Sequence, residues 1–245
     1  MMMALKGVLW HECIVFKRKF WTTTIGGMIS PILYVIAFGW GLGSNIQVEG
    51  TNYMLFVIPG IIALNTMIVS FNTTANSINI AKLYYKTFEE FMVAPINTGI
   101  YAIGKIVAGA FYGLYSATLI IALVSIFGAK LPITPYFILI IILNCLVFSA
   151  GGFLAGLMVK SHADMAKFTS FIITPMSFLC GTFFSISKMP FILDKLIWIL
   201  PLTHTSLGLR SNGEELINML QHPLILLIYF VVLFIAGIRY CKTAE

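Results

Sequence analysis

Six long stretches of the chain contain no Asp, Glu, Lys or Arg, and this feature limits the fold more than any other. The stretches are Phe20–Val48, Gly50–Ala81, Ile106–Ala129, Leu131–Val159, Phe168–Ser187 and Leu216–Ile238. Each is predominantly apolar and is long enough to supply the about 20 helical residues that cross the hydrocarbon core of a bilayer. The sequence therefore predicts an all-α integral membrane protein with six transmembrane helices.

Gly, Pro and Asn near the ends of these stretches shorten the predicted helices. We expect the spans at residues 23–42, 54–76, 106–128, 136–158, 168–187 and 223–239. The composition agrees, because 59% of the residues are hydrophobic and 10% are charged, against about 45–50% and about 25% in soluble domains. So few charges cannot cover a water-facing surface, which excludes a soluble enzyme, a nucleic-acid-binding domain and a disordered protein.

The distribution of charge predicts the orientation of the chain. Six spans place both termini on one side, and eleven of the fifteen Lys and Arg residues lie in the segments on that side. Because basic residues concentrate in cytoplasmic segments, both termini are predicted to be cytoplasmic. The formal net charge of +6 is then a topology signal and a contact with the inner leaflet of the bilayer, and it does not indicate a nucleic-acid partner.

Residues 1–21 are predicted to form a helix that lies in the cytoplasmic interface of the membrane. Its apolar stripe, at helical spacing, consists of Leu5, Leu9, Cys13, Phe16 and Phe20. Charged residues between His11 and Lys19 interrupt the apolar core that a cleavable signal peptide needs.

No catalytic, cofactor or metal site is expected in this chain. Gly99–Lys105 reads G-x-x-x-x-G-K, but Ile106 replaces the hydroxyl residue that holds Mg²⁺ in a phosphate-binding loop. The spans also lack the ionisable groups that an intramembrane enzyme or an ion-coupled carrier needs. The energy for transport is therefore expected to come from outside the chain.

Polar and aromatic side chains in two spans are candidates for a translocation path. Asn65, Asn72, Asn76 and Asn79 have the spacing of one helix face. This face either lines a path or makes interhelical hydrogen bonds that fix helix packing, and the second role is favoured. Phe111, Tyr112 and Tyr115 are candidates for substrate contact, although packed or lipid-facing positions are the more common role of aromatic residues. The pairs Gly109–Gly113 and Gly152–Gly156 predict close helix packing within the subunit.

The segment 84–98 mixes charged and large apolar residues in the sequence YYKTFEEFMVAPINT. Exposing Phe88, Phe91 and Met92 together on a plain connector would be costly. We interpret the segment as a short cytoplasmic helix that binds a soluble partner.

Several motifs resemble those of a known transporter family. They are Phe56–Gly60 (FVIPG), Phe88–Pro95 (FEEFMVAP), Thr174–Phe184 (TPMSFLCGTFF) with Met189-Pro190, and Leu200–His204 (LPLTH) followed by Arg210. With these motifs at matching positions, the full chain resembles the membrane subunit of ABC-2 type exporters, which carry out bacterial drug, antibiotic, polysaccharide and lipo-oligosaccharide efflux. The loop at Gly43–Asn52 is too short for a large extracellular domain, which favours the compact exporters.

The resemblance implies specific roles for parts of the chain. A coupling helix would dock into a separate ATPase subunit, and it consists of Thr87, Phe88, Glu89, Glu90, Phe91, Met92, Val93, Ala94 and Pro95. Residues 185–221 would form short re-entrant helices in the outer leaflet before the last span. The motif residues of this outer region are Phe183, Phe184, Pro190, Trp198, Pro201, His204 and Arg210. Residues 1–21 would be the interface helix.

The resemblance also implies the partners of the chain. Two permease copies, expected as a homodimer, would work with two ATPase subunits that bind ATP and Mg²⁺, while this chain binds no cofactor. We therefore predict a bacterial or archaeal cell-membrane permease that exports an amphiphilic or hydrophobic, drug-like substrate. Export of a polysaccharide or a lipid-linked glycan is an alternative. A small channel or secondary carrier without an ATPase is the alternative from another class.

Overall fold

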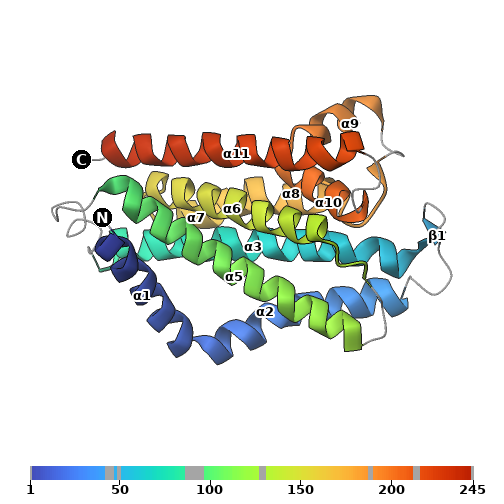
Figure 1. Ribbon diagram of the computed structural model, residues 1–245, viewed down its shortest axis with the longest axis horizontal. Helices are drawn as coiled ribbons and strands as arrows, with labels where there is room; N and C mark the ends of the chain where they lie inside the picture. Colours follow the sequence, from blue (N-terminus) through green and yellow to red (C-terminus); the bar gives the residue numbers. More distant parts are fainter. Residues whose placement is uncertain are drawn as a thin grey trace.

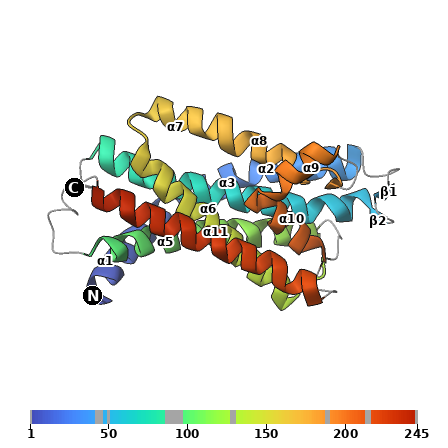
Figure 2. The same cartoon turned by 90° about the horizontal axis from the view of Figure 1, so that it is seen from above.

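The computed structural model describes residues 2–41, 47–48, 51–85, 97–126, 131–186, 190–211 and 216–243. Within these ranges the regular structure is helical, apart from a hairpin in which the two-residue strands β1 (Gln47–Val48) and β2 (Thr51–Asn52) pair antiparallel. Figures 1 and 2 show an elongated helical bundle with both termini at one end and the hairpin at the other. The predicted all-helical architecture is confirmed.

Twelve helical elements lie in the described ranges. In chain order they are α1 (Met2–Arg18), α2 (Phe20–Tyr34), the π-helix η1 (Val35–Gly41), α3 (Tyr53–Leu83), α5 (Thr98–Ile126), α6 (Pro135–Met158), α7 (His162–Phe168), the π-helix η2 (Thr169–Ile173), α8 (Thr174–Leu179), α9 (Phe191–Trp198), α10 (Pro201–Ser211) and α11 (Leu216–Thr243). Among the described residues, five stretches are long and apolar enough to cross a membrane. They are Phe20–Phe38, Tyr53–Leu83, Thr98–Ile126, Pro135–Met158 and Leu220–Thr243.

The helix predicted at residues 168–187 ends earlier than expected. α7, η2 and α8 follow one another without a break, and α8 ends at Leu179. Gly181 adopts a φ of 69°, a left-handed conformation that glycine accepts at little cost and that commonly ends a helix. In Figures 1 and 2 the α7–α8 run leads from near the end with the termini toward α10. The count of six spans stays a prediction.

Two pairs of glycines bring the central helices together. A Cβ atom added to Gly152 of α6 would lie 2.4 Å from the carbonyl oxygen of Phe71 in α3, so the backbones of α3 and α6 are in contact. A Cβ atom added to Gly109 of α5 would lie 1.8 Å from the hydroxyl oxygen of Thr74 in α3. The prediction that both G-x-x-x-G pairs serve packing within the subunit is confirmed. α3 is the central helix, contacting α6 most extensively and also α5.

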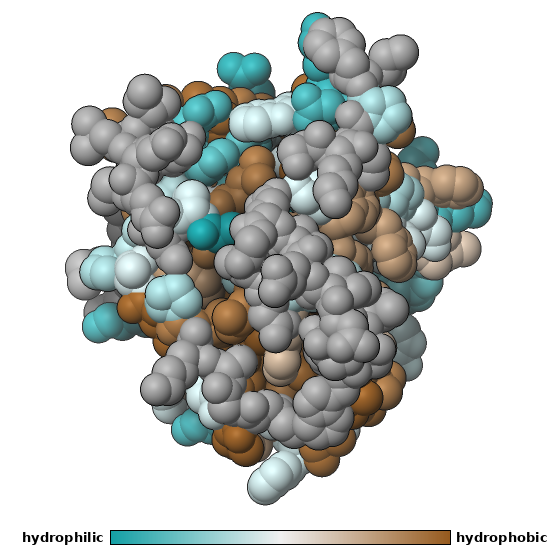
Figure 3. All heavy atoms as spheres, turned by 90° about the vertical axis from the view of Figure 1, so that its right-hand side faces the viewer, coloured by the Kyte–Doolittle hydropathy of each residue, from teal (hydrophilic) through white to brown (hydrophobic). Residues whose placement is uncertain are grey.

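The peripheral helices leave apolar faces uncovered. α2 exposes Trp21, Ile25, Ile29 and Leu33. α11 packs on α6 and exposes Leu224, Leu227, Ile228, Val231, Val232 and Ile235. Such faces suit contact with lipid tails or another apolar surface. At the end of the molecule seen in Figure 3, hydrophobic and hydrophilic residues are interspersed.

α1 packs against α5 through Val8 and through Phe16 of the predicted stripe. Val8, outside the predicted stripe, is 5% exposed, whereas Cys13 is exposed and Leu9 is only partly buried. The reason is Gly104 of α5, which has no side chain. A Cβ atom there would lie 2.6 Å from a methyl carbon of Val8. Contact of the predicted stripe with the membrane interface stays a prediction.

Candidate functional site

The predicted coupling helix, Thr87–Pro95, lies outside the described residues. The helices on either side of it are described: α3 ends at Leu83, and α5 begins at Thr98. In Figure 1 the adjoining ends of both helices lie at the end of the bundle that carries the two termini. The segment 84–98 is therefore attached at this end.

Close to that attachment, a buried ion pair joins three helices. The Lys105 ammonium nitrogen of α5 lies 2.5 Å from a carboxylate oxygen of Glu12 in α1. It also donates a hydrogen bond of 2.8 Å to the hydroxyl of Ser77 in α3. The Ser77 hydroxyl donates to the same Glu12 oxygen at 3.3 Å. Lys105 is 6% exposed and Glu12 is 7% exposed, so each charge relies on the other for neutralisation.

This ion pair places a buried charge on α5 directly before the predicted third span. In the predicted topology, Lys105 lies in a cytoplasmic connection and the third span begins at residue 106. In the structure, α5 begins at Thr98 and contains Lys105. A lysine can be buried when a carboxylate from a distant part of the chain pairs with it. The only sequence signal was a single lysine directly followed by a long apolar stretch.

The four asparagines of α3 do not form one uniform surface. Asn65 is buried and donates a hydrogen bond to the Ser116 hydroxyl of α5 at 2.5 Å. Asn72 is partly buried, Asn76 is exposed and Asn79 is fully buried. No hydrogen-bond partner for the Asn79 amide is found among the described residues. The Asn65 contact is of the interhelical kind, and a role of this face in a translocation path stays a prediction.

The aromatic candidates of α5 gather around Phe16 of α1. The rings of Phe111, Tyr112 and Tyr115 lie 5.5, 5.1 and 5.1 Å from the Phe16 ring, each edge to face. The Tyr115 hydroxyl is also 2.9 Å from the Thr24 hydroxyl of α2. These contacts hold the junction of α1 and α2 on α5. Substrate contact by these three residues stays a prediction.

A second buried polar network was missed by the sequence analysis. The Asn144 amide of α6 donates to the Thr66 hydroxyl of α3 at 2.9 Å and to the carbonyl of Ala63 at 3.2 Å. Its oxygen accepts a hydrogen bond of 2.8 Å from Thr205 of α10. The available signal was a single asparagine within the charge-free stretch Leu131–Val159.

At the opposite end of the bundle, Arg210 of α10 joins two of the motifs that carried the family resemblance. Its guanidinium donates to the carbonyls of Phe56 at 3.1 Å and of Thr182 at 3.0 Å. The guanidinium carbon lies 3.8 Å from the centre of the Phe56 ring. A Cβ atom on Gly60 would lie 2.3 Å from the Thr182 carbonyl oxygen. Glycine in the FVIPG motif therefore allows the turn after α8 to lie directly on α3.

The remaining residues of the outer region organise the short helices. His204 contacts the carbonyl of Trp198 at 2.8 Å and the Nδ1 atom of His222 in α11 at 3.2 Å. Pro190 precedes the first residue of α9, and Pro201 is the first residue of α10. The Phe183 ring lies 4.7 Å from the ring of Phe38, and Phe184 is partly buried. Entry of this region into the outer leaflet stays a prediction.

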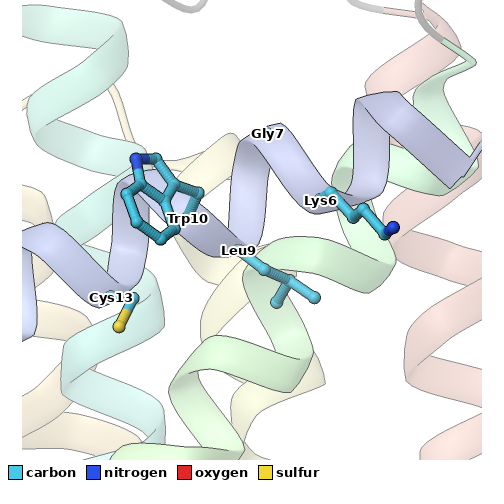
Figure 4. A pocket seen from close by; sticks show the side chains of 5 residues that line it. All are labelled: Lys6, Gly7, Leu9, Trp10 and Cys13. Atoms are coloured by element: carbon cyan, nitrogen blue, oxygen red, sulfur yellow. The ribbon is translucent and has the colours of Figure 1, made fainter.

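A shallow hollow lies on the surface of α1, shown in Figure 4. Its volume is about 570 Å³, and it is lined by Lys6, Gly7, Leu9, Trp10 and Cys13. The lining combines apolar side chains with one lysine, which suits a membrane interface. It provides no carboxylate or imidazole for acid–base chemistry. Within the described ranges, no three His, Cys, Asp or Glu residues are grouped to hold a metal ion.

Comparison with known proteins agrees with this architecture. The ABC-2 type transporter family matches residues 3–213. The chain is 30% identical over 210 residues to the inner membrane transport permease YadH of Escherichia coli (strain K12), covering 84% of this chain and 81% of YadH. It is 25% identical over 232 residues to Nodulation protein J of Rhizobium leguminosarum bv. viciae, covering 91% and 88% of the two chains. Together with the five apolar helices, these matches show that the chain is a multi-pass cell-membrane protein and belongs to the ABC-2 type transporter family.

Proposed function

We propose that the chain is the permease subunit of an ATP-driven exporter whose energy comes from a separate ATPase. The family match over residues 3–213 carries this proposal. The name of YadH, an inner membrane transport permease, supports a transport role rather than an enzymatic one. ATP and Mg²⁺ would bind to the partner subunit.

The proposed topology has six spans with both termini in the cytoplasm. The α7–α8 run leads back along the bundle toward α10 and would supply the crossing that the five long helices leave open (Figures 1 and 2). Both termini lie at one end, as an even number of crossings requires. The concentration of Lys and Arg in the segments at this end supports its cytoplasmic location.

In the proposed assembly, Thr87–Pro95 contacts the ATPase and transmits its motion to α3 and α5. Two ATPases and two permease copies would form the exporter. The exposed apolar face of α2 offers surface for lipid or for the second copy. Coupling requires that the ATPase contacts differ in free energy between its nucleotide states.

An ion-driven carrier without a partner is the competing function, and the Glu12–Lys105 pair bears on it. Buried ionisable groups can relay protons in transporters. Here the carboxylate and the ammonium satisfy each other at 2.5 Å. The buried hydrogen bonds of Asn65 with Ser116, Thr74 with Ser149 and Asn144 with Thr66, which also join described spans, involve groups that do not ionise at physiological pH. This arrangement favours an external energy source.

The proposed substrate is amphiphilic or hydrophobic. Apolar spans whose buried polar side chains are mostly Asn, Ser and Thr suit an uncharged or amphiphilic molecule. The same hydrogen-bonding side chains also suit a polysaccharide or a lipid-linked glycan, which is the second candidate. Stimulation of ATP hydrolysis by members of each class, measured on the reconstituted complex, distinguishes these two classes of substrate.

Replacing both Glu89 and Glu90 with Lys is expected to abolish ATP-driven transport or to weaken ATPase binding at least tenfold. The double substitution reverses two charges on the proposed docking helix. An ATPase groove that complements the two carboxylates would then repel the two lysines. Binding is measured by co-purification, and transport is measured in vesicles.

The Glu214-Glu215 pair provides a matched control, because it lies on the predicted outer side. Glu214→Lys with Glu215→Lys should leave ATPase binding unchanged. Native ATPase binding and transport in the Glu89→Lys, Glu90→Lys variant would rule out the coupling assignment.

A further inference from the structure

We infer that Glu12 and Lys105 are positioning residues that lock α1 onto α3 and α5, so that these three helices move as one body during transport. We call the Glu12–Lys105–Ser77 contact the latch. Its mechanical role in transport rests on the proposed function. Its role in holding α1 rests on the geometry of the three side chains.

The latch is compact and closed. The Lys105 ammonium contacts the Glu12 carboxylate at 2.5 Å and the Ser77 hydroxyl at 2.8 Å, and Ser77 donates to Glu12 at 3.3 Å. Lys105 also lies 5.7 Å from the centre of the Tyr101 ring. Separating α1 from α5 would leave two opposite charges unpaired in an environment that excludes water, and this strongly opposes separation.

The position of the latch relates it to the proposed coupling helix. Ser77 is six residues before the end of α3 at Leu83, and Lys105 is seven residues after the start of α5 at Thr98. At 1.5 Å per residue, both lie about 10 Å along the helix from the segment that joins α3 to α5. The latch therefore joins α3 and α5 to α1 at a similar distance from this segment.

Apolar contacts flank the latch along α1. Val8 lies against Gly104 one turn before Glu12, and Phe16 lies among the aromatic rings of α5 one turn after it. Apolar surfaces alone tolerate sliding and rotation of one helix on another. A buried ion pair is satisfied in one register, and specifying a register is the best-documented use of buried polar groups. The latch thus selects one position of α1 among those that the apolar contacts permit.

A disulfide between α1 and α5 reports directly on this position. Val8→Cys with Gly104→Cys places two thiols at a contact where the built Cβ of residue 104 lies 3.0 Å from the Cβ of Val8. The exposed Cys13 is replaced by Ser, and the other three native cysteines are buried. The rate of disulfide formation in membranes is then compared among chains with different latch residues.

Removing the latch charges should slow cross-linking at least fivefold. Lys105→Met alone removes the ammonium group and leaves the buried Glu12 carboxylate with the Ser77 hydroxyl and the exposed His11 imidazole, 3.7 Å away. The double variant Glu12→Gln, Lys105→Met removes both charges and keeps side chains of similar size. It should therefore fold even if the single variant Lys105→Met does not. Lys82→Met is the matched control, because Lys82 donates a hydrogen bond of 2.7 Å from α3 to the Leu157 carbonyl of α6 and does not join α1. If the neutral double variant forms the disulfide at the native rate, the charges do not hold α1 and the inference is wrong.

The one-body claim is tested with the oxidised Val8→Cys, Gly104→Cys chain reconstituted with its ATPase. Because α1 and α5 do not separate, ATP hydrolysis and transport should stay within twofold of the reduced chain. Val8→Ala with Gly104→Cys controls for the change in packing. Loss of transport that a reducing agent restores would show that α1 moves on α5, which contradicts the claim. If reduced and native chains also lack ATP-driven transport, the proposed function fails, while the cross-linking rates still decide the latch.

Discussion

Gly152→Ala is expected to lower the stability of the folded chain by about 2 kcal/mol, because an overpacked contact costs up to about 3 kcal/mol and alanine regains about 1 kcal/mol of helix propensity. The added methyl group would lie 2.4 Å from the Phe71 carbonyl oxygen and 3.1 Å from its carbonyl carbon. These are backbone atoms of α3, so no side chain can rotate away and the two central helices must separate. Thermal unfolding in detergent is followed with a thiol-reactive dye, since Cys145 and Cys180 are fully buried.

The neighbouring glycine provides the control for this prediction. A Cβ atom on Gly151 would lie 3.7 Å from a methyl carbon of Leu233 and 3.9 Å from the ring of Phe71, both ordinary contacts. Gly151→Ala should therefore leave the unfolding temperature unchanged or raise it. Equal effects of the two substitutions would show that backbone contact between α3 and α6 does not limit stability.

Arg210→Ala is expected to destabilise the outer end of the bundle by about 3 kcal/mol, because hydrogen bonds that involve a charged group contribute about 1.5–3 kcal/mol each. The substitution removes the bonds to the carbonyls of Phe56 and Thr182 and the contact with the Phe56 ring. The turn after α8 then loses its attachment to α3. Increased protease sensitivity at residues 180–190, together with a lower unfolding temperature, measures this change.

Two further variants test the reason for this effect. Arg210→Lys should not restore stability, since an ammonium group does not have the planar, forked geometry of the guanidinium. Arg239→Ala is the control of the same residue type, because Arg239 is exposed near the end of α11. Native protease resistance of the Arg210→Ala chain would show that the two motifs are held together by other contacts.

The membrane class and the approximate positions of the long helices could be predicted because both depend on hydropathy alone. A charge-free apolar stretch must be helical in a bilayer, since each backbone polar group has to be satisfied within the segment. The ends of the helices depend on tertiary contacts. α5 includes Lys105 because Glu12, 93 positions away, neutralises it. α8 ends at Leu179 because Gly181 adopts a left-handed conformation.

The residues of the candidate site that belong to sequence motifs could be predicted. The contacts between residues far apart in the sequence could not. The FVIPG motif and Arg210 could be found in the sequence, but their contact joins residues 154 positions apart. The Asn144 network draws on three helices, and no spacing rule indicates such a set. The packing of Val8 on Gly104 likewise could not be read from the helical periodicity of α1.

Dependence on a partner ATPase is the central claim, and purification of the chain from its native membrane tests it most directly. A soluble subunit with Walker motifs should co-purify at one copy per permease, and the complex should hydrolyse ATP. Both properties should be lost when Glu89 and Glu90 are replaced by Lys and should persist when Glu214 and Glu215 are replaced. A chain that purifies alone and supports flux across vesicles without ATP would contradict the claim.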